Sequence, residues 1–100
     1  MQEATDALAE AARLLPTRAR VHYNYGLALD QMGRDDLAEA SLLRAQRLDP
    51  EDPAAPYALA LFYANSGRRN QALDWAERLR TLRPGDPQVH RLIASLRASP

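Results

Sequence analysis

Apolar residues recur at steps of three and four along most of the chain, which is the spacing of an amphipathic helix. Two such stretches follow one another at residues 21–33 and 35–50, and Gly33 between them supplies the left-handed backbone that ends many helices. The pattern therefore predicts a pair of helices joined by a tight turn. The apolar positions are Val21, Tyr25, Leu29 and Met32 in the first stretch, and Leu37, Leu42, Ala45 and Leu48 in the second.

This two-helix pattern returns after 34 residues. The segment LDPEDP at residues 48–53 reappears as LRPGDP at residues 82–87, and Gly33 has its counterpart in Gly67. The agreement extends over many positions, which indicates an internal repeat and a stacked helical architecture. Other positions at the same spacing are Pro16, Pro50 and Pro84, Leu14, Leu48 and Leu82, and Ala4, Ala38 and Ala72.

The repeated segment carries the signals that end one helix and begin the next. Pro50 ends the helix before it, because the residue preceding a proline is pushed out of the helical region. Asp52–Pro53 and Asp86–Pro87 each place a capping aspartate before a proline at the first helical position, and Thr17 is expected to cap in the first copy. Pro56 lies about one turn into its helix, where we expect an irregular start and not a break.

The phase of the repeat predicts a single domain over residues 1–100, with about six helices. Residues 3–15 look like a second helix without its first partner, residues 19–52 and 53–86 like two whole repeats, and residues 87–97 like a closing helix. We therefore expect the chain to be part of a longer protein. Leu8 and Leu14 should leave apolar surface on the first helix, for a missing repeat or for another chain.

Composition narrows the classes of function. The 13 basic and 13 acidic residues cancel, so no overall field attracts nucleic acid or an anionic membrane, and neither is expected as a partner. The chain has no cysteine, which excludes disulfides and thiolate metal sites, and no apolar run that approaches a membrane span. We expect a soluble protein, cytoplasmic or periplasmic. A lysine-free sequence rich in alanine and arginine suggests a bacterial source.

Catalytic chemistry has little support in the sequence. His22 and His90 are the only histidines, and they occupy the same repeat position without any His-x-x-x-His or Glu-x-x-His spacing. A packing role is the better reading of both. Glu51 and Asp52 are better explained as linker and cap than as a catalytic pair. We predict no catalytic, cofactor-binding or metal-binding residues, no cofactor, and hence no enzyme.

The period and the alternation of small and large residues resemble those of the tetratricopeptide repeat family. The matching positions are Tyr25, Gly26, Leu29, Ala38, Leu42, Ala45 and Pro50 in one repeat, and Leu59, Ala60, Tyr63, Ala72, Ala76, Leu79 and Pro84 in the next. The resemblance covers essentially the whole chain. It implies an all-α fold in which antiparallel helix pairs form a right-handed superhelix. The family's early tryptophan is replaced by His22, Pro56 and His90.

The same resemblance implies a protein–protein interaction module whose first helices line a concave groove. Tyr23 and Tyr57, and likewise Leu27 and Leu61, are 34 residues apart and form a repeated aromatic–aliphatic pattern suited to a peptide or helix. The predicted groove residues are Arg20, Tyr23, Asn24, Leu27, Tyr57, Leu61 and Arg91. The basic residues with which some family members clamp a carboxylate are absent, so we expect recognition by apolar contact.

Three alternatives stay open at this level. The tyrosines can simply cover the space between adjacent helices. The function can instead be structural, by stacking on neighbouring repeats or by homodimers formed through the open ends. Trp75, the sole tryptophan, is expected to pack against the closing helix, and a partner contact on the outer surface is its alternative.

Overall fold

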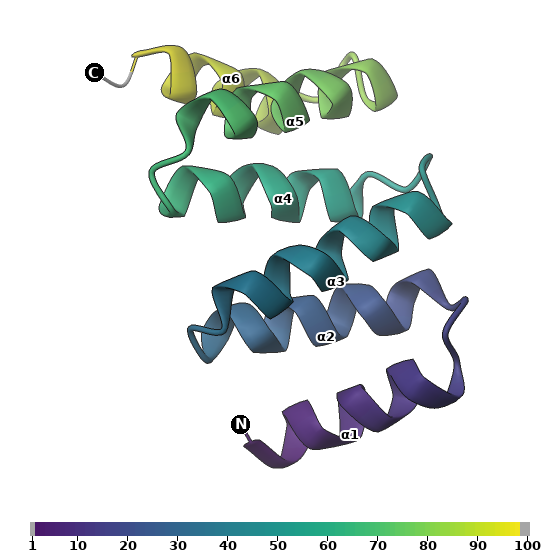
Figure 1. The fold of residues 1–100 in the computed structure, drawn as a ribbon. Coiled ribbons are helices and arrows are strands. Elements are labelled where there is room, and N and C mark those ends of the chain that lie inside the picture. Colours follow the sequence, from purple (N-terminus) through teal and green to yellow (C-terminus); the bar gives the residue numbers. More distant parts are fainter. Residues whose placement is uncertain (1, 99–100) are drawn as a thin grey trace. The chain divides into compact units, whose positions relative to one another are not determined.

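The structure, a computed structural model, describes residues 2–98, and this part of the chain forms six helices and no strand (Figure 1). The all-α prediction is confirmed, and the helices end close to the predicted positions. None of the described helices is long and apolar enough to cross a membrane. The helices are α1 (Gln2–Leu14), α2 (Ala19–Gln31), α3 (Asp35–Leu48), α4 (Ala54–Asn65), α5 (Arg69–Leu82) and α6 (Pro87–Ala98).

The chain divides into two compact units, Met1–Pro50 and Glu51–Pro100. The first unit holds α1, α2 and α3, and the second holds α4, α5 and α6. The division falls inside the segment LDPEDP, where the repeat ends one helix and begins the next. The assignment of residues 1–100 to one domain, with two whole repeats between two half repeats, stays a prediction.

The turns inside the two helix pairs have the same geometry. Gly33 and Gly67 adopt φ angles of +75° and +77°, a region that residues with a Cβ rarely enter. Beyond each glycine the chain folds back: the Arg34 N–H donates to the Leu29 carbonyl at 2.9 Å, and the Arg68 N–H donates to the Tyr63 carbonyl at 2.8 Å. The predicted glycine stops are confirmed, and each one leads directly into the second helix of its pair.

Aspartates cap two first helices as predicted. The Oδ1 atom of Asp52 accepts the Ala54 N–H at 2.9 Å, and that of Asp86 accepts the Gln88 N–H at 2.9 Å. The expected cap at Thr17 was wrong. Arg18 is the residue that precedes α2, and its side chain has no acceptor with which to cap a backbone N–H.

The expected irregularity at Pro56 was also wrong. The Tyr57 N–H donates to the Pro53 carbonyl at 3.1 Å, so α4 is regular from its first turn. Pro56 is the third residue of α4, where a backbone N–H would have no acceptor inside the helix. Its ring is instead among the most deeply buried side chains of the chain.

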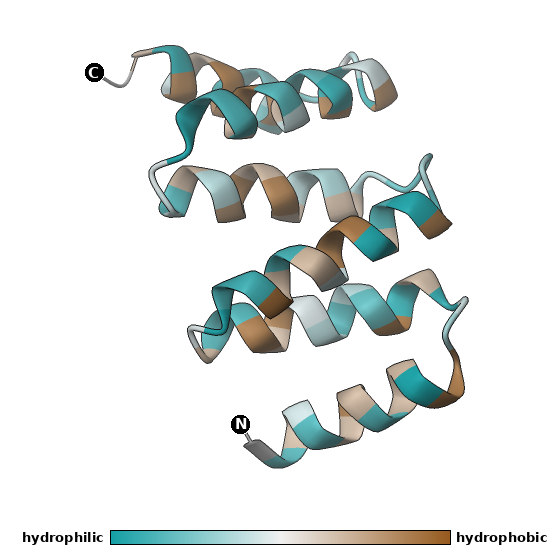
Figure 2. Ribbon diagram, in the orientation of Figure 1, coloured by the Kyte–Doolittle hydropathy of each residue, from teal (hydrophilic) through white to brown (hydrophobic). Residues whose placement is uncertain are grey.

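In the first unit the core lies between α2 and α3, on the apolar stripes that the helices present (Figure 2). Leu29, Ala38, Leu42 and Ala45 are each at most 2% exposed. At Gly26 the two helices lie close together, and a Cβ there would be 2.8 Å from Leu42 Cγ. Such a distance is below any normal contact, so α3 can pack at this separation only because residue 26 is glycine.

The second unit has the same arrangement, but the large and the small side chain of its second helix have exchanged places. Ala76 and Leu79 of α5 stand where the first unit has Leu42 and Ala45, and Ala60 replaces Gly26. Ala60, Ala76 and Leu79 are all at most 1% exposed. The exchange conserves apolar volume within each pair, which is the kind of change that a core tolerates. On its other side α5 packs on α6, whose Val89, Ile93 and Leu96 are buried.

We expect Gly67→Ala to lower the free energy of unfolding by about 1 kcal/mol, because a Cβ at positive φ collides with the backbone. Gly85→Ala, in the same unit, is the matched control. Gly85 has no positive φ and no heavy atom near the place of a Cβ, so its change should stay within about 0.5 kcal/mol. Thermal unfolding followed by circular dichroism measures both, and equal losses would contradict the role given to the turn.

Candidate functional site

Four of the predicted groove residues lie on α2 of the first unit. Arg20 and Asn24 are exposed, and Tyr23 and Leu27 are half-buried. Tyr23 and Leu27 are four residues apart and therefore share one face of the helix. That face differs from the stripe of Gly26 and Leu29, which is buried against α3. The first unit therefore offers a tyrosine and a leucine side by side, each with part of its surface in water.

The second unit repeats the pair on α4. Tyr57 is half-buried and Leu61 is 38% exposed. Most of this helix is buried: Leu59, Phe62 and Tyr63 are each at most 4% exposed. Leu61 is thus an exposed large apolar residue on the most apolar helix of the chain, where burial is otherwise the rule.

On α6 the corresponding face is more polar. Gln88 and Arg91 are exposed, and Leu92 is half-buried. Arg91 is the predicted groove residue on this helix, and its role there stays a prediction. The predicted residues are thus distributed over three first helices, with Arg20, Tyr23, Asn24 and Leu27 in one unit and Tyr57, Leu61 and Arg91 in the other. A groove that combines the two units stays a prediction.

The two histidines hold loops and do not fill the core. His22 Nε2 lies 2.9 Å from the Pro16 carbonyl oxygen, and His90 Nε2 lies 2.8 Å from that of Pro84. A carbonyl can only accept, so each ring donates from Nε2. Arg44 also donates to the Pro16 carbonyl, at 3.1 Å. The predicted packing role is therefore corrected: each imidazole instead forms a hydrogen bond to the turn that precedes its helix.

Trp75 is buried, with 8% of its surface exposed. Arg78 lies one turn further along α5, and its guanidinium carbon sits 4.3 Å from the centre of the indole ring. Such cation–π contacts hold an arginine flat on the ring and exclude water from it. The alternative of a partner contact through an exposed Trp75 is therefore wrong.

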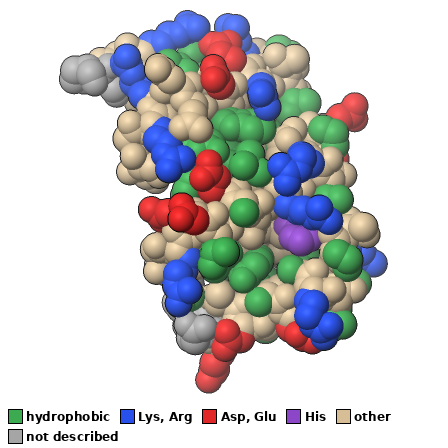
Figure 3. All heavy atoms as spheres, in the orientation of Figure 1, with side chains coloured by type: hydrophobic (Ala, Val, Ile, Leu, Met, Phe, Trp, Pro, Cys, Tyr) green, Lys and Arg blue, Asp and Glu red, His purple; other side chains and the backbone are tan. Residues whose placement is uncertain are grey.

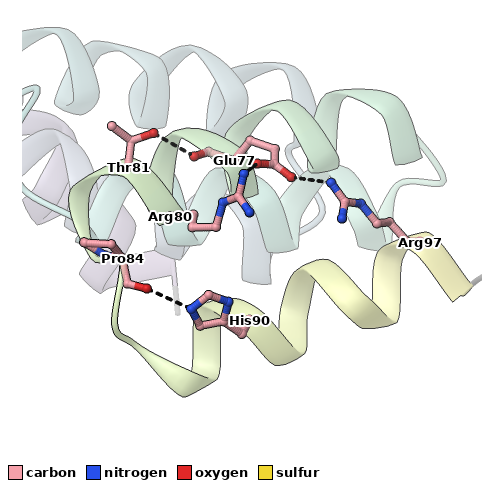
Figure 4. A network of polar contacts seen from close by, with 6 residues as sticks. All are labelled: Glu77, Arg80, Thr81, Pro84, His90 and Arg97. Atoms are coloured by element: carbon pink, nitrogen blue, oxygen red, sulfur yellow. Dashed lines mark hydrogen bonds and ion pairs between the residues drawn. The ribbon is translucent and has the colours of Figure 1, made fainter.

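A polar network joins α5 to α6 in the second unit (Figure 4). Glu77 accepts from Arg97 at 2.8 Å and forms an ion pair with Arg80 at 2.5 Å. Thr81 donates to the backbone carbonyl of the same glutamate at 3.2 Å. These side chains are partly or largely exposed, so each pair adds little stability. Of these contacts, only the one between Arg97 and Glu77 links α6 to α5.

Sequence reasoning missed a small cleft in the first unit, with a volume of about 160 Å³. Its walls include Thr5 and Ala9 of α1, Tyr25 of α2, Met32 directly after α2, and Leu37 of α3. The Thr5 hydroxyl donates to the Met32 sulfur at 2.9 Å across one side of it. Leu37 is 51% exposed at its rim. The only hint in the sequence was Leu37, an apolar residue in an otherwise polar first turn.

Charges of both signs alternate over the face shown in Figure 3, without a large patch of one sign. On α1 a hydrogen bond from Arg13 lowers the pKa of the Glu10 carboxyl, but this exposed pair is not part of any cluster. Among residues 2–98 no group of histidine and carboxylate side chains could hold a metal ion.

Two family models match the chain, and both are described as tetratricopeptide repeat; they cover residues 44–96 and residues 19–52. None of the curated proteins matches it. Similar solved structures include TTC0263, a thermophilic TPR protein in Thermus thermophilus, with 32% identity and a TM-score of 0.89 over 98% of this chain and 50% of that one.

MamA is similar with 25% identity and a TM-score of 0.88, over 95% of this chain and 52% of that one. The Yersinia enterocolitica type III secretion chaperone SycD, solved in complex with a peptide of the translocator YopD, has 18% identity and a TM-score of 0.87. That match covers 96% of this chain and 79% of SycD, and it shows the fold alone. The chain thus spans about half the length of MamA and TTC0263.

Surface and core tyrosines should respond differently to truncation. Tyr63 is 2% exposed, with its ring 5.4 Å from that of Phe62, so Tyr63→Ala should cost about 3–5 kcal/mol of unfolding free energy. The half-buried Tyr57 lies on the same helix, and Tyr57→Ala should cost only about 1 kcal/mol. Chemical denaturation measures both values. Similar losses would mean that Tyr57 serves the core and would favour the covering role.

Proposed function

Because this chain belongs to the tetratricopeptide repeat family, we propose that it is a non-catalytic interaction module which binds a peptide or helix of a partner protein on its first helices. Proteins of this family generally act through binding, and stacked helical repeats offer extended surfaces for it. The proposed contact residues are Arg20, Tyr23, Asn24, Leu27, Tyr57, Leu61 and Arg91.

One observation carries the proposal: the same tyrosine–leucine pair is kept partly in water in both repeats. Tyr23 with Leu27, and Tyr57 with Leu61, are all half-buried or exposed. A leucine needed only for stability would be expected in the core, where full burial is worth about 1.5–3 kcal/mol. A tyrosine has few rotatable bonds, so it can add contact area to a partner at a small cost in entropy.

The charges on these first helices suggest which kind of ligand would bind. Arg20 and Arg91 are exposed on first helices, whereas α4 has no acidic or basic residue. A ligand that combines apolar residues with acidic ones would match these residues. The fold has such a use elsewhere, since SycD has been solved with a peptide of YopD. Because SycD is only 18% identical to this chain, the proposal depends on the residues of this chain and not on the similarity to SycD.

A displayed library of random peptides of about 15 residues, selected on the purified chain, tests the proposal. We expect apolar-centred peptides whose dissociation constants rise at least about tenfold with Tyr23→Ala combined with Tyr57→Ala, since truncating a contact tyrosine commonly costs about 1–2 kcal/mol.

Leu37→Ala is the matched control, because Leu37 is an exposed apolar residue at the start of α3 and is not one of the proposed contact residues. It should leave peptide affinity unchanged. Circular dichroism of each variant verifies that its helices are intact. Selected peptides that bind the double variant as tightly as the unsubstituted chain would place the interaction elsewhere.

A further inference from the structure

The cleft beside Met32 lies within the first unit, and all three helices of that unit contribute to its walls. Its volume is about 160 Å³. Pockets for drug-sized ligands have roughly 300–1,000 Å³, whereas an engineered apolar cavity of about 150 Å³ holds one benzene-sized molecule. The cleft can therefore take a compact ligand and is too small for a nucleotide.

The cleft is separate from the exposed apolar face of α1. That face consists of Ala4, Leu8 and Ala11, which are exposed or half-buried. The cleft is lined instead by Asp6 and Ala9 of the same helix. Because successive residues of a helix are about 100° apart, Ala9 and Asp6 lie about 140° and 200° around α1 from Ala4. A helix packed on the face of Ala4 would therefore leave the cleft open.

Several residues of the cleft are not ones that the repeat requires. Three of its apolar side chains are replaced by larger or polar ones in the next copy of the repeat. The pairs, each 34 residues apart, are Ala9 and Leu43, Met32 and Ser66, and Leu37 and Gln71. The cleft is thus a feature of these particular side chains and not of the repeat fold.

Apolar groups form one part of the lining. Leu37 is 51% exposed at the rim, where an aliphatic group of a ligand would cover it. The Met32 side chain is half-buried, and its sulfur accepts the hydrogen bond from the buried Thr5 hydroxyl. A thioether side chain is flexible and polarisable, so it adapts to the shape of what packs against it.

Charged groups of both signs complete the lining. Arg34 is exposed, and its guanidinium forms no hydrogen bond or ion pair with any of residues 2–98. The Tyr25 hydroxyl has no partner in this part of the chain either. Asp6 lies on the wall formed by α1. A carboxylate has about four acceptor sites, so Asp6 can accept from a ligand in addition to the contact that it already makes.

We propose that this cleft binds a free α-amino acid with an aliphatic side chain of about the size of leucine. The carboxylate of the ligand pairs with Arg34, whose parallel N–H groups can hold both oxygens, and accepts from the Tyr25 hydroxyl. Its ammonium group faces Asp6, and its side chain covers Met32 and Leu37. A zwitterion with an apolar side chain is the ligand that matches a cation, an anion and an apolar wall in one small cleft.

Titration of the isotope-labelled chain with L-leucine, followed by NMR, provides the test. We expect the shifted amide signals to belong to the first unit, and the dissociation constant to be on the order of 1 mM, because the ligand has few atoms. Arg34→Gln and Asp6→Asn should each weaken leucine binding about tenfold or more, since each removes a charged partner of the ligand.

Two analogues of leucine assign each charge of the ligand to its residue. Leucinamide lacks the carboxylate and N-acetyl-leucine lacks the positive charge, so each should bind the unsubstituted chain about tenfold more weakly than leucine. Arg34→Gln should not weaken the binding of leucinamide further, because the group that pairs with Arg34 is already missing. For the same reason Asp6→Asn should leave the binding of N-acetyl-leucine unchanged.

The matched control is Arg68→Gln. Arg68 is the counterpart of Arg34 in the next copy of the repeat and lies in the second unit, so its loss should leave leucine affinity unchanged. Tyr23→Ala combined with Tyr57→Ala should also leave it unchanged, because neither tyrosine lines the cleft. The site is therefore distinct from the proposed peptide surface, and the two proposals can fail separately.

Three outcomes would overturn the inference. If no amide signal of the first unit shifts at the solubility limit of leucine, the cleft holds no such ligand. If N-acetyl-leucine binds as tightly as leucine, Asp6 takes no part and the ligand is the carboxyl end of a peptide. If Arg68→Gln weakens binding as much as Arg34→Gln, the effect is one of overall charge. The NMR spectrum of each variant verifies that its fold is intact.

Discussion

Each helix pair depends on a small residue of the first helix lying against the second. In the first unit this residue is Gly26, which leaves room for Leu42 where even a methyl group would be too close. The second unit keeps the approach with Ala60 and Ala76, and places the larger side chain at Leu79. Because the helices can approach so closely, most of the apolar stripe is removed from water although the chain is short.

The polar groups around these helix pairs determine where the helices begin more than they stabilise the fold. Asp52 and Asp86 satisfy backbone N–H groups where first helices begin, and His22 and His90 hold the preceding turns through proline carbonyls. The same devices therefore recur at equivalent places in the repeat. They set where each helix starts, and so which side chains of α2, α4 and α6 remain in contact with water.

The exposed apolar side chains of these helices form two kinds of surface, and each kind is exposed for a different reason. The tyrosine–leucine pairs of α2 and α4 lie beside complete cores, so their exposure is not caused by a missing neighbour. The faces of α1 and α6 are exposed for the opposite reason: their counterparts in α3 and α2 are buried by a paired helix. We propose the first kind as the surface for a ligand of another protein.

The sequence alone determined the helices and their ends at Gly33 and Gly67, because a helical period and a positive φ are local properties. It could not decide the roles of Pro56, His22 and Trp75, or reveal the cleft beside Met32. These depend on which atoms of distant segments meet. Whether a given side chain is covered is settled by its neighbours in space, and tertiary packing alone supplies those neighbours.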